Sequence, residues 1–358
     1  MADGRAWASV AAVTHTVRSG RAAERTIVER ATIVDVARTA GVSVSTVSKV
    51  INDRDGVAAE TYERVMSVVA ELGYESSLVA SSLRRRSTNV VGVLVPQFEP
   101  FSTELLKGIS TATEGTGYEL LAYSGDLSHN EIGWERRSLS RLAGTLIDGA
   151  VIVAPTAAVT TATIPVVAID PHTGRTGPST VEVDNIGGAR AATEHLIGLG
   201  HTRIAHVRGR TDLVSAEQRE QGYREALQAA GLPYDPELVR VGGYRAVETT
   251  EAAHELLSLP NRPSAIFAAN DLSAIRVLEV AAEMGIRVPE ELSVVGFDNV
   301  PEAANFSPAL TTVSQPMHQI GAEAIRILME LLNGESKEEH LRLPASMVIR
   351  ASTAAFSG

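Results

Sequence analysis

Several acidic and amide side chains in this 358-residue chain directly follow short apolar runs. The residues at the ends of these runs are Asp170, Asn270, Asp271 and Asp298. Arg219 lies in a helical pattern, one turn after Ser215. Carboxylates together with a fork-shaped guanidinium can bind neighbouring hydroxyl groups through paired hydrogen bonds. These residue types therefore predict a binding site for a polyhydroxyl ligand.

Three phenylalanines lie in loops at similar positions, namely Phe98, Phe101 and Phe306. An aromatic face packs well against the C–H surface of a sugar ring, so we expect these rings at the same site. The acidic residues favour a neutral sugar over a phosphate, which would need several cations. An aspartate at a strand end can instead cap the next helix, and this alternative stays open for Asp271 and Asp298.

The elements that must position these residues are visible as an alternation of apolar runs and helical patterns. The expected strands are 90–95, 118–122, 150–153, 166–169, 204–207, 265–268 and 294–297. The expected helices are 103–113, 189–199, 216–230, 247–257 and 272–284. This alternation predicts an α/β fold with doubly wound parallel sheets, whose ligands bind beyond the carboxyl ends of the strands. A body of about 260 residues suggests two such lobes with a cleft between them.

The first part of the chain has a different, helical character, because no proline occurs before Pro96. Thr32 and Asp35 form a capping pattern at the start of an amphipathic stretch. Gly41 permits a turn, and Ser43 can cap a second helix. This spacing is typical of a helix-turn-helix, whose second helix enters the major groove of DNA. A third helix is expected over 58–72, with Tyr62, Val65, Val69 and Leu72 facing inward.

The outer face of the second helix carries short polar and β-branched side chains, namely Val44, Ser45, Thr46, Ser48 and Lys49. Such residues are poor fillers of an exposed helix but suit contacts with phosphates and base edges. The alternative is an ordinary αα-hairpin. Residues 78–86 then give a short amphipathic stretch that ends in three arginines, and Leu83 can wedge into a minor-groove step. The alternative for this stretch is a plain basic linker.

Composition excludes several classes of protein. The net charge is −11, but residues 1–89 hold 12 Lys/Arg against 10 Asp/Glu, and the remainder holds 20 against 33. The absence of cysteine excludes disulfides and thiol chemistry and fits a reducing cytoplasm. No apolar run approaches the ~20 residues of a membrane span. No common catalytic or phosphate-binding motif occurs, so we expect no enzyme, no cofactor and no metal site. Trp134 is expected at a solvated helix start, and the alternative is a stacking platform for a ligand.

The segment from Thr32 to Asn52, TIVDVARTAGVSVSTVSKVIN, resembles the signature of the lactose-repressor (LacI/GalR) family. Glu71-Leu72-Gly73-Tyr74 and the stretch after it also match in order and spacing. Further similar motifs are 268–271, 294–299 and 307–316. The resemblance extends from about residue 31 to the C-terminus and is strongest in the helical head.

The resemblance implies a role in DNA binding for particular residues. Val44, Ser45 and Lys49 would contact bases, and Leu83 would intercalate from a hinge helix. The complete set expected at operator DNA is Thr32, Ser43, Val44, Ser45, Thr46, Ser48, Lys49, Asn52, Ala80, Leu83 and Arg84.

The resemblance also implies a periplasmic-binding-protein-like body that forms a homodimer and binds a small effector. Effectors in the family are carbohydrates or their phosphates, with purines as an exception. Arg219 and Asp271 would be effector ligands, with Asp170 close by. The complete set expected at the effector is Phe98, Phe101, Asp170, Arg219, Asn270, Asp271, Asp298 and Phe306.

The expected domains follow from these patterns. Residues 1–30 are expected to be a disordered extension, 31–75 the DNA-binding domain, 76–89 the hinge and linker, and 90–352 the effector domain. The two lobes are expected to be 90–183 with 317–336, and 184–316 with 337–352. The function implied is a cytoplasmic, sugar-released repressor of carbohydrate-utilisation genes. The alternatives are an activator or corepressor-dependent regulator of the same fold, and a solute-binding protein.

Overall fold

The computed structural model describes residues 31–51, 54–74, 87–125, 132–157, 159, 162–172, 178–244, 246–335 and 339–357. The chain divides into two compact units, Met1–Ser77 and Leu78–Gly358, and each is described by itself. The expected extension 1–30 and the expected DNA-binding residues Asn52, Ala80, Leu83 and Arg84 lie outside the described residues.

The first unit contains three short helices, α1 (Ile33–Ala40), α2 (Val44–Ile51) and α3 (Ala59–Glu71). A capping box begins α1: the Thr32 hydroxyl accepts from the Asp35 amide at 3.3 Å, and the Asp35 carboxylate accepts from the Thr32 amide at 2.9 Å. Gly41 ends α1 with a φ of 67°, which glycine adopts without steric cost. The expected helix-turn-helix is thereby confirmed.

Valine side chains hold these helices together. Val36, Val47 and Val65 are fully buried, one from each helix, and each contributes roughly 1.5–3 kcal/mol by leaving water. The prediction of which α3 residues face inward was wrong at one position. Tyr62 lies in the first turn of α3 and is 37% exposed, while Val68 is buried one turn after Val65.

The first lobe of the second unit is a six-stranded parallel sheet in the order β11-β5-β4-β3-β1-β2. Its strands are β1 (Val90–Val95), β2 (Glu119–Ser124), β3 (Gly149–Val153), β4 (Val166–Ile169), β5 (Ser179–Val183) and β11 (His340–Leu343). Its helices are α5 (Pro100–Thr113), α6 (Trp134–Leu142) and α12 (Met317–Leu332). Every residue of β1, β3, β4 and β5 is buried, as expected for parallel strands covered on both faces.

The second lobe repeats this plan in the order β12-β10-β9-β8-β6-β7, with only β12 antiparallel to its neighbour. Its strands are β6 (Ile204–Arg208), β7 (Val239–Val241), β8 (Ala265–Ala268), β9 (Ser293–Asp298), β10 (Thr311–Ser314) and β12 (Ser346–Val348). Its helices are α7 (Asn185–Gly198), α8 (Val214–Ala229), η1 (Pro236–Leu238), α9 (Ala246–Leu257), α10 (Asp271–Glu283) and α11 (Pro301–Asn305). The expected fold class, a helical head and a two-lobed α/β body, is confirmed.

One part of the expected lobe assignment was wrong. Residues 337–352 were expected in the second lobe, but β11 pairs with β5 of the first sheet, and only β12 joins the second sheet. The hydrogen-bonding edge that β5 offers lies in the first sheet, so the chain completes that sheet before it crosses back. The other domain boundaries stay predictions.

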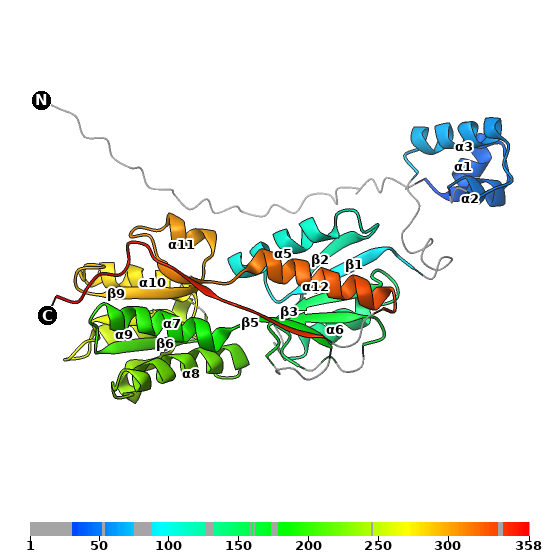
Figure 1. Ribbon diagram of the computed structural model, residues 1–358. Helices are drawn as coiled ribbons and strands as arrows, with labels where there is room; N and C mark the ends of the chain where they lie inside the picture. Colours follow the sequence, from blue (N-terminus) through cyan, green and yellow to red (C-terminus); the bar gives the residue numbers. More distant parts are fainter. Residues whose placement is uncertain are drawn as a thin grey trace, which may run out of the picture. The chain divides into compact units, whose positions relative to one another are not determined.

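The chain crosses between the lobes at three places: after β5, after β10 and after β11. Figure 1 shows the two lobes side by side, with the red C-terminal segment running along both. The largest apolar cluster contains residues of both lobes, including Val95 and Val183 from one and Ala189 and Phe297 from the other. No helix among the described residues is both long and apolar enough to cross a lipid bilayer.

Candidate functional site

The outer face of α2 presents the residues that the sequence assigned to base contacts. Val44 is 42% exposed, and Ser45 and Lys49 are also exposed. The inner face of the same helix is held by Val47 and Val50, which are buried. A short helix with one fixed face and one exposed face is the form in which side chains reach base edges.

Hydroxyl groups organise the start of α2. The Ser43 hydroxyl accepts from the Thr46 amide at 3.1 Å and lies 2.7 Å from the Ser45 hydroxyl and 2.8 Å from that of Thr46. Thr32, also expected at DNA, is exposed and caps α1. Ser48 and Thr46 are half-buried. These residues fix the two helices and remain close to the exposed face of the first unit.

A cavity of about 190 Å³ lies between the two lobes of the second unit. Residues from both lobes line it, and they come from the ends of strands and the starts of helices, where the sequence placed a ligand site. Of the residues expected at the effector, the cavity contains Phe101, Asp170, Arg219, Asn270 and Asp298. The cavity thus brings together five of the expected effector residues, although they are far apart along the chain.

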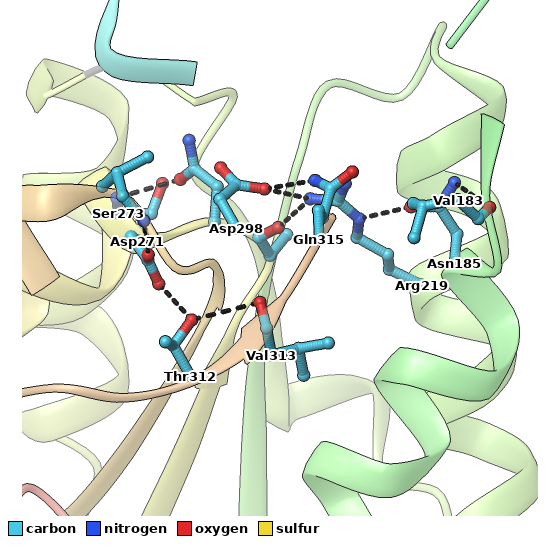
Figure 2. Close-up of polar contacts among 12 residues, drawn as sticks. Val183, Asn185, Arg219, Asp271, Ser273, Asp298, Thr312, Val313 and Gln315 are labelled. Carbon is cyan, nitrogen blue, oxygen red and sulfur yellow. Dashed lines mark hydrogen bonds and ion pairs between the residues drawn. The ribbon is translucent and has the colours of Figure 1, made fainter. Parts of the chain in front are cut away.

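Arg219 is held in place by four neighbours, and Figure 2 shows its polar contacts with Asn185 and Asp298. Its Nε donates to Asn185 Oδ1 at 2.8 Å, and its Nη1 donates to the Ala269 carbonyl. The same Nη1 lies 3.6 Å from Asp298 Oδ1, and the guanidinium carbon lies 3.8 Å from the centre of the Phe297 ring. Arg219 is 4% exposed, so these contacts compensate for the removal of its charge from water.

Asp298 ends β9 in a backbone conformation that favours glycine, with a φ of 119°. Such a conformation in a non-glycine residue costs roughly 1–3 kcal/mol and is common at functional sites. Gln315 Nε2 donates to Asp298 Oδ1 at 2.7 Å. Burial raises the pKa of Asp298 to about 7, although Arg219 and Gln315 favour the charged form. The carboxyl group can therefore change its charge near neutral pH.

Asp271 lies outside the cavity, contrary to the expectation. It is fully buried: its carboxylate accepts from the Thr312 hydroxyl and, at 2.9 Å, from the Val300 amide. Burial and the nearby Asp298 charge raise the pKa of Asp271 well above its usual value. The helix cap is instead Asn270, whose side chain accepts from the Ser273 amide at 2.9 Å. The carboxylate of Asp271 thus joins β10 to the loop after β9.

Two of the expected phenylalanines also lie away from the cavity. Phe98, which precedes α5, is 55% exposed and does not line the cavity. Phe306 follows α11 and packs against the apolar cluster of the second lobe, beside a separate groove that Leu278 and Pro308 also line. The sequence placed these rings in the right kind of loop but did not determine which way they face.

The cavity also contains residues that were not expected there, among them Trp134, His172 and Tyr244. Trp134 is 1% exposed, so the expectation of a solvated helix start was wrong. Trp134 Nε1 and His172 Nδ1 are buried and have no hydrogen-bond partner among the residues that the structure describes, and the buried Tyr244 hydroxyl lies beside the Ser215 side chain without a hydrogen bond of ordinary length and angle. Each such group costs roughly 1–3 kcal/mol, so their gathering around one cavity is a functional signal.

Charged groups of opposite sign meet in the cavity. The carboxylates are Glu99, Asp170 and Asp298, and the cations are Arg210 and Arg219. Arg210 bonds to the Asp212 carboxylate at 3.0 and 2.7 Å, and Arg219 is paired with Asp298. Among the described residues, no cluster of side chains is suited to hold a metal ion.

Two family models match the chain. The model described as "Bacterial regulatory proteins, lacI family" matches residues 32–77, and the one described as "Periplasmic binding protein-like domain" matches residues 193–353. The first covers the helix-turn-helix. The second covers most of the second lobe together with α12 and β11 of the first lobe.

Similar proteins match along almost the whole chain. "HTH-type transcriptional repressor PurR" of Aliivibrio fischeri (strain MJ11) is 35% identical over 338 residues, which are 90% of this chain and 98% of that protein. A solved "transcriptional regulator CelR-cellobiose complex" is 34% identical, with a TM-score of 0.66, over 90% of this chain and 100% of that one. The lac repressor dimer bound to operator and the anti-inducer ONPF is 26% identical, with a TM-score of 0.77, over 91% and 100%.

These matches include both of the sites described above. An exposed helix that can contact DNA stands in one unit, and a cavity between two α/β lobes stands in the other. The chain belongs to the LacI family and is a DNA-binding transcriptional regulator.

Proposed function

We propose that this regulator is a repressor of carbohydrate-utilisation genes. It binds a pseudo-palindromic operator as a homodimer in the cytoplasm and releases the operator when a small neutral sugar occupies the cavity. In this proposal the two heads contact two half-sites, and the hinge residues Ala80, Leu83 and Arg84 contact the minor groove between them.

The exposed side chains of α2 support the operator contacts. Lys49 can donate to O6 and N7 of guanine, Ser45 can donate or accept, and Val44 can pack against a thymine methyl group. Four further residues are proposed to contact the DNA backbone or to support the α2 face, namely Thr32, Ser43, Thr46 and Ser48.

The balance of charges in the cavity supports the choice of a neutral sugar. Glu99, Asp170 and Asp298 outnumber the two arginines, and both arginines already bond to carboxylates. A phosphate would find few uncommitted cations there. Hydroxyl groups, in contrast, can donate to carboxylates and accept from donors such as Trp134 Nε1, which has no partner in the described part of the chain.

A second candidate is a corepressor-dependent regulator of the same fold, with a purine base as its ligand. The observation that favours it is the aromatic character of one part of the cavity, because Phe101, Trp134 and Tyr244 offer faces on which a planar base can stack. The relative named PurR is 35% identical to this chain. An activator remains a further alternative, since the fold does not fix the position of the operator in a promoter.

The operator contacts are tested by gel shift with a duplex that the full chain enriches from a randomised pool. We expect Lys49→Ala to weaken binding by ~1–3 kcal/mol, or about 5- to 150-fold. Lys107→Ala is the matched control, because it also removes one exposed lysine but from the body. Equal affinity of Lys49→Ala and Lys107→Ala would contradict the role of Lys49.

The ligand class is tested by isothermal titration of the full chain with cellobiose, ribose, glucose 6-phosphate and hypoxanthine, followed by gel shift with the same compounds. We expect a neutral sugar to bind best and to release the duplex, because a ligand shifts the conformational equilibrium only by its differential affinity. Tighter binding of glucose 6-phosphate would overturn the neutral-sugar proposal. Hypoxanthine that strengthens duplex binding would favour the second candidate.

A further inference from the structure

Two buried amide side chains stand where the chain crosses between the lobes. Asn185 begins α7 just after β5 and is 2% exposed. Gln315 follows β10 just before α12 and is 5% exposed. Neither residue lines the cavity, and each lies on a different crossing segment.

Each amide bonds to one of the two oppositely charged cavity residues (Figure 2). Asn185 Oδ1 accepts from Arg219 Nε at 2.8 Å, and Gln315 Nε2 donates to Asp298 Oδ1 at 2.7 Å. Arg219 Nη1 and Asp298 Oδ1 are 3.6 Å apart. The four side chains therefore form one continuous row that joins two crossing segments through the cavity wall.

We propose that Asn185 and Gln315 are positioning residues that transmit the state of the Arg219–Asp298 pair to the crossing segments. This inference rests on the proposed function, in which a ligand occupies the cavity. A ligand that bonds to Arg219 or Asp298 changes the separation of the pair. The amides then carry this change to the backbone after β5 and after β10, where the angle between the lobes is set.

The bonds in this row suit such a role better than a purely structural one. Both amides donate to or accept from a charged group, and such hydrogen bonds are roughly twice as strong as neutral ones. Asn185 is itself fixed to the second lobe, because its Nδ2 donates to Gln218 Oε1 at 3.3 Å. A buried polar row that is fully bonded is rigid, so a displacement at one end moves the other end.

The row also predicts a pH signature. Gln315 favours the charged form of Asp298, so its removal raises the pKa of Asp298 above about 7. The charged groups that face Asp298 from neighbouring elements are Arg219, Asp170, Glu99 and Asp271. A ligand that needs the carboxylate loses affinity as the pH falls through this pKa. In a Gln315→Leu variant the same loss begins at a higher pH.

The first arm of the test needs no ligand. Hydrogen–deuterium exchange is measured on the full-length Asp298→Asn and Arg219→Lys variants. These variants change the cavity pair but keep the side chains similar in size. We expect faster exchange at the crossing segments 183–187 and 313–317. Thr113→Val is the control, because it removes a buried hydrogen bond of α5 in the first lobe, away from both segments. Unchanged exchange at both segments, or the same change in Thr113→Val, overturns the inference.

The second arm uses whichever of cellobiose, ribose, glucose 6-phosphate and hypoxanthine binds the unmodified chain best. We expect Gln315→Leu and Asn185→Ala to weaken its binding by about tenfold, and Gln315→Leu to shift the pH profile upward. Binding with an unshifted profile overturns the inference even if the affinity falls. If none of the four compounds binds, the proposed ligand class fails, and the exchange arm alone decides the role of the amides.

Discussion

The side chains around the cavity are arranged for a ligand at some expense of stability. Asp298 adopts a φ of 119°, and Tyr244 has a φ of 62°. Two buried polar atoms of the cavity residues, Trp134 Nε1 and His172 Nδ1, have no partner among the described residues. A core built only for stability would avoid both features, and their coincidence at one place favours a binding role.

The Tyr244 hydroxyl provides a test at this scale, because the chain offers a matched control. We expect Tyr244→Phe to leave the unfolding free energy of the ligand-free chain unchanged or slightly higher, since its hydroxyl makes no hydrogen bond of ordinary length and angle among the described residues, and to weaken binding of the best ligand. Tyr223→Phe loses the 2.8 Å bond to the Ile204 carbonyl and should lower stability by about 1 kcal/mol without affecting binding.

Urea denaturation and isothermal titration measure the two effects. The opposite pattern, with Tyr244→Phe destabilised and binding normally, would mean that the hydroxyl serves the fold. The contrast is informative because both residues are tyrosines of the second lobe.

The rule that ligands bind beyond the carboxyl ends of parallel strands located part of the cavity from the sequence. Asp170, Asn270 and Asp298 lie at or within two residues of the carboxyl ends of strands that meet there, so their placement follows from topology. Asp271 lies one residue beyond Asn270, and that single step turns its side chain into the lobe. Trp134 and Tyr244 come from a helix start and a loop, which carry no comparable signal.

At the scale of elements, apolar runs identified seven strands, β1 to β4, β6, β8 and β9, but not β5, β7, β10, β11 and β12. β4 and β8 have the expected bounds, since all four residues of each are buried. β7 and β12 have only three residues each, and β10 has the sequence TTVS. Short or polar strands lack the apolar run that marks a strand, and only their pairing with a neighbour defines them.

The packing of α7 against α8 offers a test at this scale. A Cβ atom on Gly222 of α8 would lie 2.3 Å from the Ile186 carbonyl oxygen, so the two helices must separate to accept it. We expect Gly222→Ala to cost about 1–3 kcal/mol of stability and to weaken ligand binding, because Arg219 and Asn185 lie on these two helices.

Gly198→Ala is the control, since a Cβ atom there meets nothing within 4 Å and alanine favours the helix by up to ~1 kcal/mol. Thermal denaturation of both variants measures the difference. A Gly222→Ala variant as stable as Gly198→Ala would show that the contact between these helices can relax.

At the scale of the whole molecule, charge is divided between the units. Residues 31–89 contain seven basic and seven acidic residues, while residues 90–358 contain 20 basic and 33 acidic ones. No general positive field therefore attracts DNA. Affinity must come from individually placed groups, of which Lys49 is exposed in the described part of the head.

This division predicts weak binding to DNA of random sequence. We expect a Kd of roughly 10⁻⁵ M or weaker at physiological salt, near the weak end of the usual range. Fluorescence anisotropy with a labelled random duplex measures it, and the enriched duplex serves as the positive control. A submicromolar Kd for random DNA would show that the negative charge of the body does not weaken non-specific binding to DNA.

The late strands β11 and β12 have a consequence for biosynthesis. They are the outermost strands of the two sheets, and α12, which packs against the first sheet, also comes from the C-terminal part of the chain. A nascent chain that has emerged only to β10 therefore lacks an edge of both lobes and a covering helix of the first. Each sheet is therefore complete only when a strand from the C-terminal part of the chain has joined it.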